Sequence, residues 1–233
     1  MRFRAVFFDA GETLVHAHPS FPQLFADVLA REGFPVGVEA VHAQMGHVAE
    51  RFSQAAREQE LWTTSPSRSQ AFWLSVYERF LRDLEVPSDD ELHAALHHAF
   101  TDLANYALFD DVAPVLTSLR AAGTILGVVS NFEEWLERLL DRLGVLPAFD
   151  VRVVSGLEGM EKPDLRIYRL ALERAGVDAA DAAFVGDNPE FDVDPPAALG
   201  MFPVLIDRRD RYDGFVGTKI RRLTDLPAAL ETA

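Results

Sequence analysis

An aspartate directly follows the first apolar segment of the chain, where it is well placed to do chemistry. Residues 5–8 are Ala-Val-Phe-Phe, Asp9 comes next, and Gly11 lies two residues further on. A short apolar run is typical of a buried strand, and the carboxyl end of a buried parallel strand delivers the next side chain to a surface crevice. We therefore expect Asp9 to act as a nucleophile or a metal ligand. A carboxylate at the position of Gly11 would act as a proton donor, but glycine has none.

Other reactive side chains stand at similar places in the chain. Ser130 and Asp187 each follow an apolar run, as Asp9 does, while Lys162 precedes a predicted helix and Asp192 comes five residues after Asp187. The strand ends of an open parallel sheet face one crevice, so these groups can converge although they are far apart in sequence. A carboxylate nucleophile, a hydroxyl, an ammonium group and further carboxylates suit phosphoryl transfer to aspartate, with a divalent cation neutralising charge. Mg²⁺ prefers such carboxylate oxygens, which Asp9 and Asp187 would supply.

The elements that must position these groups follow from the apolar pattern after residue 108. Strand-like runs occur at 125–129, 149–154, 182–185 and 204–206 and alternate with helical patterns. We expect one of these helices to begin at Pro163 and to end at Gly176, because proline favours the first turn and glycine the residue after the last. Strands that alternate with helices indicate a parallel sheet covered on both faces. We predict an α/β class, doubly wound, Rossmann-like core formed by residues 1–14 and 108–233.

The segment between these two parts, residues 15–107, has helical periodicity and no convincing strand. Phe72, Val76 and Phe80 repeat at a spacing that would place them on one helix face. Helices are also expected over residues 21–31 and 38–57, and Ser88 is expected to cap a further helix. We therefore predict an inserted, all-helical cap domain.

Composition restricts the partners of the protein. The net charge is −15, from 22 Lys and Arg against 37 Asp and Glu, and there is no cysteine among the 233 residues. An acidic surface repels phosphate backbones and anionic lipids, so we predict no nucleic-acid and no membrane partner. The lack of cysteine excludes disulfides and thiolate metal sites. We see neither a signal-peptide pattern nor an apolar run long enough to cross a bilayer, and we expect a cytoplasmic monomer or homodimer.

Four short motifs occur in order along the chain and carry a resemblance to a known family. They are Asp9-Ala10-Gly11-Glu12-Thr13-Leu14, Val129-Ser130-Asn131, Glu161-Lys162-Pro163-Asp164 and Gly186-Asp187-Asn188-Pro189-Glu190-Phe191-Asp192. One Asp-x-x-x-Thr alone is a weak signal, whereas four motifs in series are specific. The chain thus resembles the haloacid dehalogenase (HAD) superfamily of aspartyl-nucleophile hydrolases. It is most similar to the subgroup of rhythmically expressed gene product 2-like hydrolases, and its insert is similar to their four-helix cap.

The resemblance implies a role for each matching residue in the reaction. Asp9 would attack phosphorus and become an aspartyl-phosphate. Ser130 and Asn131 would hold the phosphoryl oxygens, and Lys162 would neutralise the nucleophile and the transferred group. The implied substrate is a small phosphorylated metabolite.

The resemblance also implies a Mg²⁺ site, with Asp9, Asp187, Asp192 and the backbone carbonyl of Gly11 as its ligands. The acid–base carboxylate that family phosphatases carry at the position of Gly11 is absent. General acid–base catalysis typically contributes about a hundredfold to ten-thousandfold. We therefore expect a weak or selective phosphatase that turns over substrates with good leaving groups.

Two alternatives remain open from the sequence. Haloacid dehalogenases share the nucleophile and need no acid, although their fourth motif differs from that of this chain. A low-turnover protein that binds a phosphorylated ligand or a partner would also retain the fold. A third class, the phosphonate hydrolases, is nearly eliminated. These enzymes need a cap lysine to form a Schiff base, and the insert at 15–107 contains no lysine.

Overall fold

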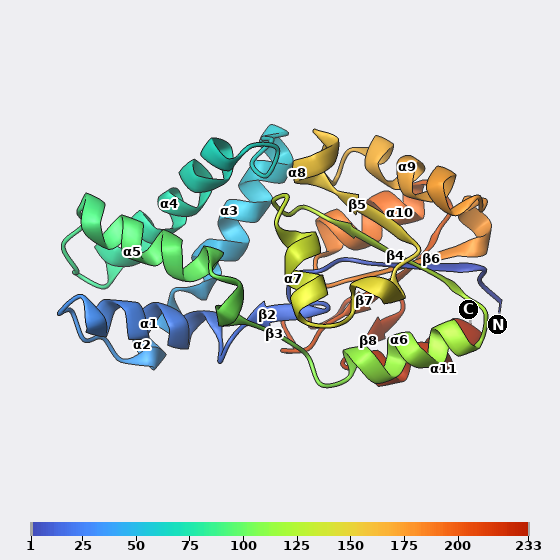
Figure 1. Ribbon diagram of the computed structural model, residues 1–233, viewed down its shortest axis with the longest axis horizontal. Coiled ribbons are helices and arrows are strands. Elements are labelled where there is room, and N and C mark those ends of the chain that lie inside the picture. The colour runs from blue at the N-terminus through green and yellow to red at the C-terminus, as the bar shows by residue number, and fades with distance from the viewer. Residues whose placement is uncertain (1, 233) are drawn as a thin grey trace. The chain divides into compact units, whose positions relative to one another are not determined.

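The computed structural model describes residues 2–232, which divide into two compact units (Figure 1). One unit joins Met1–Val15 to Leu108–Ala233, and the other is His16–Ala107. The chain passes between the units within two short strands, β2 (Val15–Ala17) and β3 (Tyr106–Leu108), which pair as a two-stranded sheet. The sequence predicts no strand in this region, because three residues are too few to show an alternating pattern.

The first unit is built on a six-stranded sheet, and the predicted α/β fold class is confirmed. Its order is β5-β4-β1-β6-β7-β8, and all neighbouring strands pair in parallel. The strands are β1 (Ala5–Phe8), β4 (Ile125–Ser130), β5 (Val151–Val154), β6 (Ala182–Gly186), β7 (Phe202–Ile206) and β8 (Lys219–Ile220). The central strands β1 and β6 are fully buried, as expected for a parallel sheet covered on both faces.

Helices cover both faces of this sheet, with α9 on one side and α6 and α11 on the other (Figure 1). The helices of this unit are α6 (Val112–Ala121), α7 (Leu136–Arg142), α8 (Ser155–Glu158), α9 (Leu165–Ala175), α10 (Asp194–Ala198) and α11 (Leu226–Glu231). The expected start of α9 at Pro163 is wrong by two residues. Asp164 has non-helical backbone angles and accepts a hydrogen bond from the Arg166 N–H, so Asp164 is the N-cap.

The second unit is helical and has a core of its own. It contains α1 (Phe21–Arg31), α2 (Val38–Ala43), α3 (Met45–Glu58), α4 (Pro66–Asp83) and α5 (Asp90–Thr101). Phe25, Phe80 and Leu96 are fully buried within one apolar cluster of this unit. None of the helices described among residues 2–232 has both the length and the apolar character to cross a membrane.

Two sequence expectations for the helical unit are wrong in detail. The single helix expected over 38–57 is two helices, because the chain turns at Gln44 between α2 and α3. The cap of α5 is Asp89 rather than Ser88: the Asp89 carboxylate accepts the Leu92 N–H at 2.8 Å, while the Ser88 hydroxyl lies 2.7 Å from His93 Nε2. A carboxylate at an N-cap also interacts favourably with the positive end of the helix.

Candidate active site

The sheet brings the nucleophile candidate next to the candidate phosphate-binding strand. Phe8 is in register with Val128 of β4 and Val185 of β6, so Asp9 emerges between the ends of these two strands. The Asp9 amide donates to the Val185 carbonyl at 2.9 Å, which fixes its backbone. Ser130, the last residue of β4, donates its hydroxyl to Asp9 Oδ1 at 3.0 Å. The carboxylate of Asp9 and the hydroxyl of Ser130 therefore lie at the same edge of the sheet.

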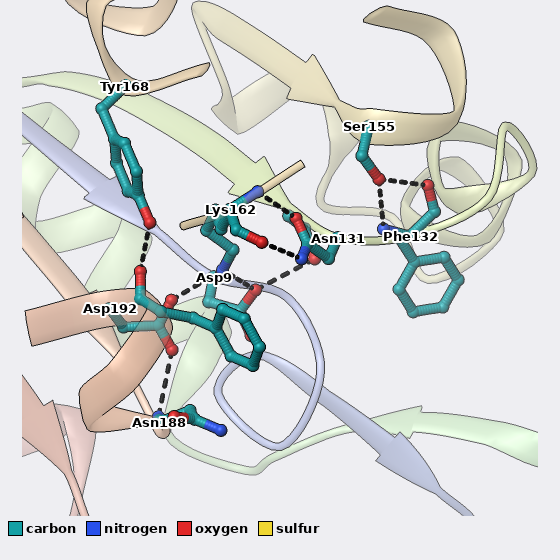
Figure 2. Close-up of polar contacts among 10 residues, drawn as sticks. Asp9, Asn131, Phe132, Ser155, Lys162, Tyr168, Asn188 and Asp192 are labelled. Atoms are coloured by element: carbon teal, nitrogen blue, oxygen red, sulfur yellow. Dashed lines mark hydrogen bonds and ion pairs between the residues drawn. The ribbon is translucent and has the colours of Figure 1, made fainter. Parts of the chain in front are cut away.

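Lys162 bridges two of the aspartates at this edge. Its Nζ lies 2.7 Å from Asp9 Oδ1 and 2.6 Å from Asp192 Oδ1, and all three side chains are at most one-tenth exposed. Figure 2 shows the ammonium group between the two carboxylates. Burial alone would lower the pKa of Lys162, but the charges of Asp192 and Asp9 outweigh it and raise that pKa above its ordinary value. Lys162 is therefore a permanent cation beside Asp9.

Asn131 positions Lys162 through its backbone. The Asn131 side chain accepts the Lys162 N–H at 2.7 Å and donates to the Lys162 carbonyl at 2.8 Å (Figure 2). This pair of hydrogen bonds ties the end of β4 to the segment that precedes α9. In this structure the Asn131 amide is thus engaged with the chain itself, and its predicted contact with phosphoryl oxygens stays a prediction.

The three aspartates form a compact oxygen cluster. Among the described residues, Asp9, Asp187 and Asp192 each offer a carboxylate oxygen, and these oxygens lie within 4.8 Å of one another. Burial and the charge of Asp9 raise the pKa of Asp187 to about 7. Burial likewise raises the pKa of Asp192 to about 6, although the charge of Lys162 opposes the rise. Carboxylate oxygens gathered this closely are the donor set that a hard divalent cation stabilises, so the residues present fit Mg²⁺.

Close packing behind the cluster fixes Asp192. A Cβ at Gly186 would lie 2.2 Å from Asp192 Cγ, so only glycine fits at the end of β6. The Asn188 N–H donates to Asp192 Oδ2 at 3.0 Å, and the Tyr168 hydroxyl donates to the Phe191 carbonyl beside it (Figure 2). These contacts hold the short π-helix Pro189–Val193 against the sheet, with Asp192 only 1% exposed.

Gly11 lies in the tight turn that follows β1, where its backbone bridges to Val15. A Cβ at this glycine would meet no other atom within 4 Å, so there is room for a side chain that the sequence does not supply. The neighbouring Glu12 has a positive φ of 53° and pairs with Arg209 at 2.6 Å. Glu12 is thereby engaged with the loop after β7.

The sequence reasoning missed a set of arginines at the same edge. Arg211 Nη2 lies 2.6 Å from Asp187 Oδ2, and Arg208 donates to the buried carboxylate of Asp111 and to the Thr13 carbonyl. The signal that could have revealed them is the run Arg208-Arg209-Asp210-Arg211, which directly follows Asp207 at the end of a predicted strand in an otherwise acidic chain.

Comparisons with known proteins agree on the family. A model of the haloacid dehalogenase-like hydrolases matches residues 3–200. The zebrafish (Danio rerio) haloacid dehalogenase-like hydrolase domain-containing protein 3 is 29% identical over 98% of this chain and 96% of its own length. A phosphoserine phosphatase from Thermus thermophilus is 33% identical, over 54% of this chain and 51% of its own length.

Solved structures agree on the fold. YfnB from Bacillus subtilis, described as a HAD-hydrolase and solved bound to magnesium, superposes with a TM-score of 0.78 over 99% of both chains at 17% identity. The L-2-haloacid dehalogenase RSc1362 superposes with a TM-score of 0.76 over 99% of this chain and 100% of its own, at 22% identity. The match of the family model covers most of the chain, and its four motifs converge at one edge of the sheet. The chain belongs to the haloacid dehalogenase-like hydrolase family.

Proposed function

We propose that the protein is a Mg²⁺-dependent phosphatase that hydrolyses a small phosphorylated metabolite through an aspartyl-phosphate on Asp9. The observation that carries the proposal is Lys162, whose buried ammonium lies 2.7 Å from Asp9 Oδ1 and 2.6 Å from Asp192 Oδ1. A cation held beside a carboxylate lets that carboxylate approach an anionic phosphoryl group without prohibitive repulsion. The phosphatase named among the relatives supports the same substrate class.

The residues at the sheet edge divide the work of the reaction. The Asp9 carboxylate attacks phosphorus, and the Ser130 hydroxyl, which now donates to Asp9 Oδ1 at 3.0 Å, donates to a phosphoryl oxygen once substrate is present. The Lys162 ammonium compensates the charge on the transferred group. Asp9, Asp187, Asp192 and the Gly11 carbonyl would hold Mg²⁺, which supplies charge neutralisation and orientation of the phosphoryl group. A water molecule then attacks phosphorus, the bond between phosphorus and the Asp9 carboxylate oxygen breaks, and inorganic phosphate leaves with both protons of that water.

The lack of a carboxylate at Gly11 restricts the substrates. Without a carboxylic acid at position 11 to protonate it, the leaving oxygen departs as an anion, which is favourable only when its conjugate acid is strong. We therefore propose low activity on alkyl phosphates and higher activity on aryl or acyl phosphates. If turnover is very low, the same site would serve mainly to bind phosphorylated ligands.

The test is hydrolysis of p-nitrophenyl phosphate by the purified protein with Mg²⁺. We expect turnover that stops with a chelator and falls more than about a thousandfold in Asp9→Asn, since loss of a covalent nucleophile removes the main path. Asp213→Asn, which removes an exposed carboxylate elsewhere, is the matched control and keeps full activity. Hydrolysis that persists in Asp9→Asn contradicts the proposal. Release of halide from 2-haloacids in the presence of the chelator would establish the dehalogenase alternative instead.

A further inference from the structure

Arg211 forms an ion pair with one of the three clustered aspartates. Its Nη2 lies 2.6 Å from Asp187 Oδ2 and 3.5 Å from the Asp187 carbonyl oxygen. The Arg211 side chain is 42% exposed, whereas that of Asp187 is 16% exposed. The guanidinium of a partly exposed side chain therefore contacts a mostly buried carboxylate of the oxygen cluster.

The backbone that carries Arg211 is firmly held, so the side chain can move alone. Asp207, which is fully buried at the end of β7, accepts the Arg211 N–H at 2.8 Å and the Tyr212 N–H at 3.0 Å. Lys219 donates to the Tyr212 carbonyl at 2.9 Å and reaches Asp207 Oδ2 at 3.4 Å. These contacts hold the backbone at Arg211, so a change in the position of the guanidinium does not require this backbone to move.

The charge balance of the cluster explains why Arg211 binds there. Three carboxylates, Asp9, Asp187 and Asp192, face two cationic side chains, Lys162 and Arg211. Lys162 contacts Asp9 and Asp192, which leaves Arg211 as the cation on Asp187. A divalent cation bound by the same carboxylates would supply the charge that Arg211 now supplies, and two positive groups beside one carboxylate repel each other.

We propose that Arg211 is a built-in competitor of the divalent cation for Asp187, so that the cation displaces the guanidinium and Arg211 sets the cation affinity of the site. The inference rests on the proposed function, because it requires the cation to bind at Asp187. A guanidinium that only oriented Asp187 for the cation would have the opposite effect, since loss of an orienting partner weakens metal binding about tenfold to a hundredfold.

The loop after β7 also contains a second arginine that serves as a matched control for Arg211. Arg209 lies two residues from Arg211, carries the same charge and pairs with Glu12 rather than with the aspartate cluster. The test is Mg²⁺ binding measured by calorimetry without substrate, in the wild-type protein and in Arg211→Gln, Arg211→Lys and Arg209→Gln. We expect Arg211→Gln to bind Mg²⁺ about tenfold more tightly, a typical size for coupling between two ligands. Arg211→Lys keeps the charge and stays close to wild type, and Arg209→Gln changes affinity less than about threefold, because its charge lies outside the cluster.

Asp187→Asn separates the two proposals. Loss of Mg²⁺ binding in Asp187→Asn locates the cation at the cluster, and the Arg211 variants then judge the competition alone. Equal or weaker binding by a natively folded Arg211→Gln overturns the competition and leaves the phosphatase proposal standing. Binding that Asp187→Asn does not change, or no binding by wild type and all variants, overturns both proposals. A larger rise in the thermal midpoint on adding Mg²⁺ to Arg211→Gln than to wild type is the second supporting readout.

Discussion

Asp9 and Gly11 show how two residues in one turn set both the chemistry and its limits. Asp9 has a hydroxyl and an ammonium group within 3.0 Å, whereas Gly11 leaves open space beside the same turn. In the proposed reaction, these groups serve attack on phosphorus and charge neutralisation. Gly11 supplies no carboxylic acid to protonate the leaving group, and a variant can restore that acid.

We predict that Gly11→Asp raises the kcat for alkyl phosphates. A Cβ at this position meets no atom within 4 Å, so the new carboxyl group fits and can protonate the leaving oxygen. The expected gain is about tenfold to a hundredfold, below the full range of general acid catalysis because the new group is not pre-oriented. Gly11→Ala is the control for loss of glycine alone and should show no gain. Steady-state rates on an alkyl and an aryl phosphate measure the effect, and an equal change for both substrates would contradict it.

Gly186→Ala should disrupt the oxygen cluster by displacing Asp192. The new methyl group would lie 2.2 Å from Asp192 Cγ, so either the strand or the aspartate must shift. Overpacking of this kind costs about 1–3 kcal/mol, and the displaced Asp192 would also weaken Mg²⁺ binding. Urea unfolding and calorimetry measure the two effects. Gly11→Ala, which has open space, should show neither loss, and a Gly186→Ala protein with native Mg²⁺ affinity would show that the position of Asp192 does not matter.

At the scale of elements, one buried ion pair joins segments that are far apart in sequence. Arg208 donates to both Asp111 oxygens at 2.9 Å and to the Thr13 carbonyl at 2.9 Å, and Asp111 also accepts the Leu223 N–H at 2.8 Å. These contacts tie the turn after β1 to the start of α6 and to the segment before α11. The pair therefore holds the loop that carries Gly11 in place.

The pair should make stability depend on pH in the acid range. Burial alone would raise the pKa of Asp111, but the hydrogen bonds and charge of Arg208 outweigh it and lower that pKa below its ordinary value. A carboxyl group whose pKa is lower in the folded state contributes stability above its unfolded value, about 3.9, and loses it as the pH falls through the folded value. We predict that Asp111→Asn flattens the loss of stability below about pH 4 relative to wild type. Urea midpoints between neutral and acid pH test this, with Asp213→Asn as the control that keeps the wild-type slope.

Removing the cation of this ion pair should lower the free energy of unfolding more than removing an exposed charge does. Arg208→Met leaves Asp111, which is 4% exposed, without its guanidinium partner. A buried charge left unpaired costs about 3–5 kcal/mol. Arg221→Met, which removes an arginine paired with Asp210 at the surface, should cost less than about 1 kcal/mol. Equal urea midpoints for the two variants would contradict a structural role of Arg208.

At the scale of the whole molecule, two separate cores allow the units to be perturbed independently. The helical unit packs Phe25, Phe80 and Phe100 together, while the α/β unit buries Phe7 and Phe184. Phe80→Ala should destabilise the helical unit by about 3–5 kcal/mol, the usual cost of a truncated core aromatic. It should leave the Mg²⁺ affinity unchanged, because Asp9, Asp187 and Asp192 all belong to the other unit.

Phe184→Ala is the matched variant in the α/β unit. Its ring is fully buried and packs edge-on against Tyr168, with Lys162 Nζ 5.6 Å from the ring centroid. We expect this variant to lose stability and Mg²⁺ affinity together, because the cavity lies beside the lysine that orders the aspartates. Urea unfolding and calorimetry on both variants distinguish the two patterns, and a loss of Mg²⁺ affinity in Phe80→Ala would show that the cores are coupled.

Local sequence patterns are sufficient to predict the strands that carry the candidate site residues. The apolar runs before Asp9, Ser130 and Asp187 predict buried strands, and parallel strands place their carboxyl ends on one edge for reasons of connectivity alone. Boundaries were less predictable, because a cap is chosen by competition between neighbouring polar groups. Asp164 rather than Pro163 begins α9, and Asp89 rather than Ser88 caps α5.

The sequence by itself determined the fold class and the family, and it indicated Asp9, Ser130, Lys162, Asp187 and Asp192 at the sheet edge but not the arginines. Tertiary structure alone decided how they pair. Lys162 contacts Asp9 across 153 residues and Asp192 across 30, and Arg211 takes Asp187 while Arg209 takes Glu12. The physical reason is that charges pair according to distance and burial, which depend on the strand order β4-β1-β6-β7 and on side-chain packing. The cation that stands beside each aspartate at that edge therefore follows from the folded sheet.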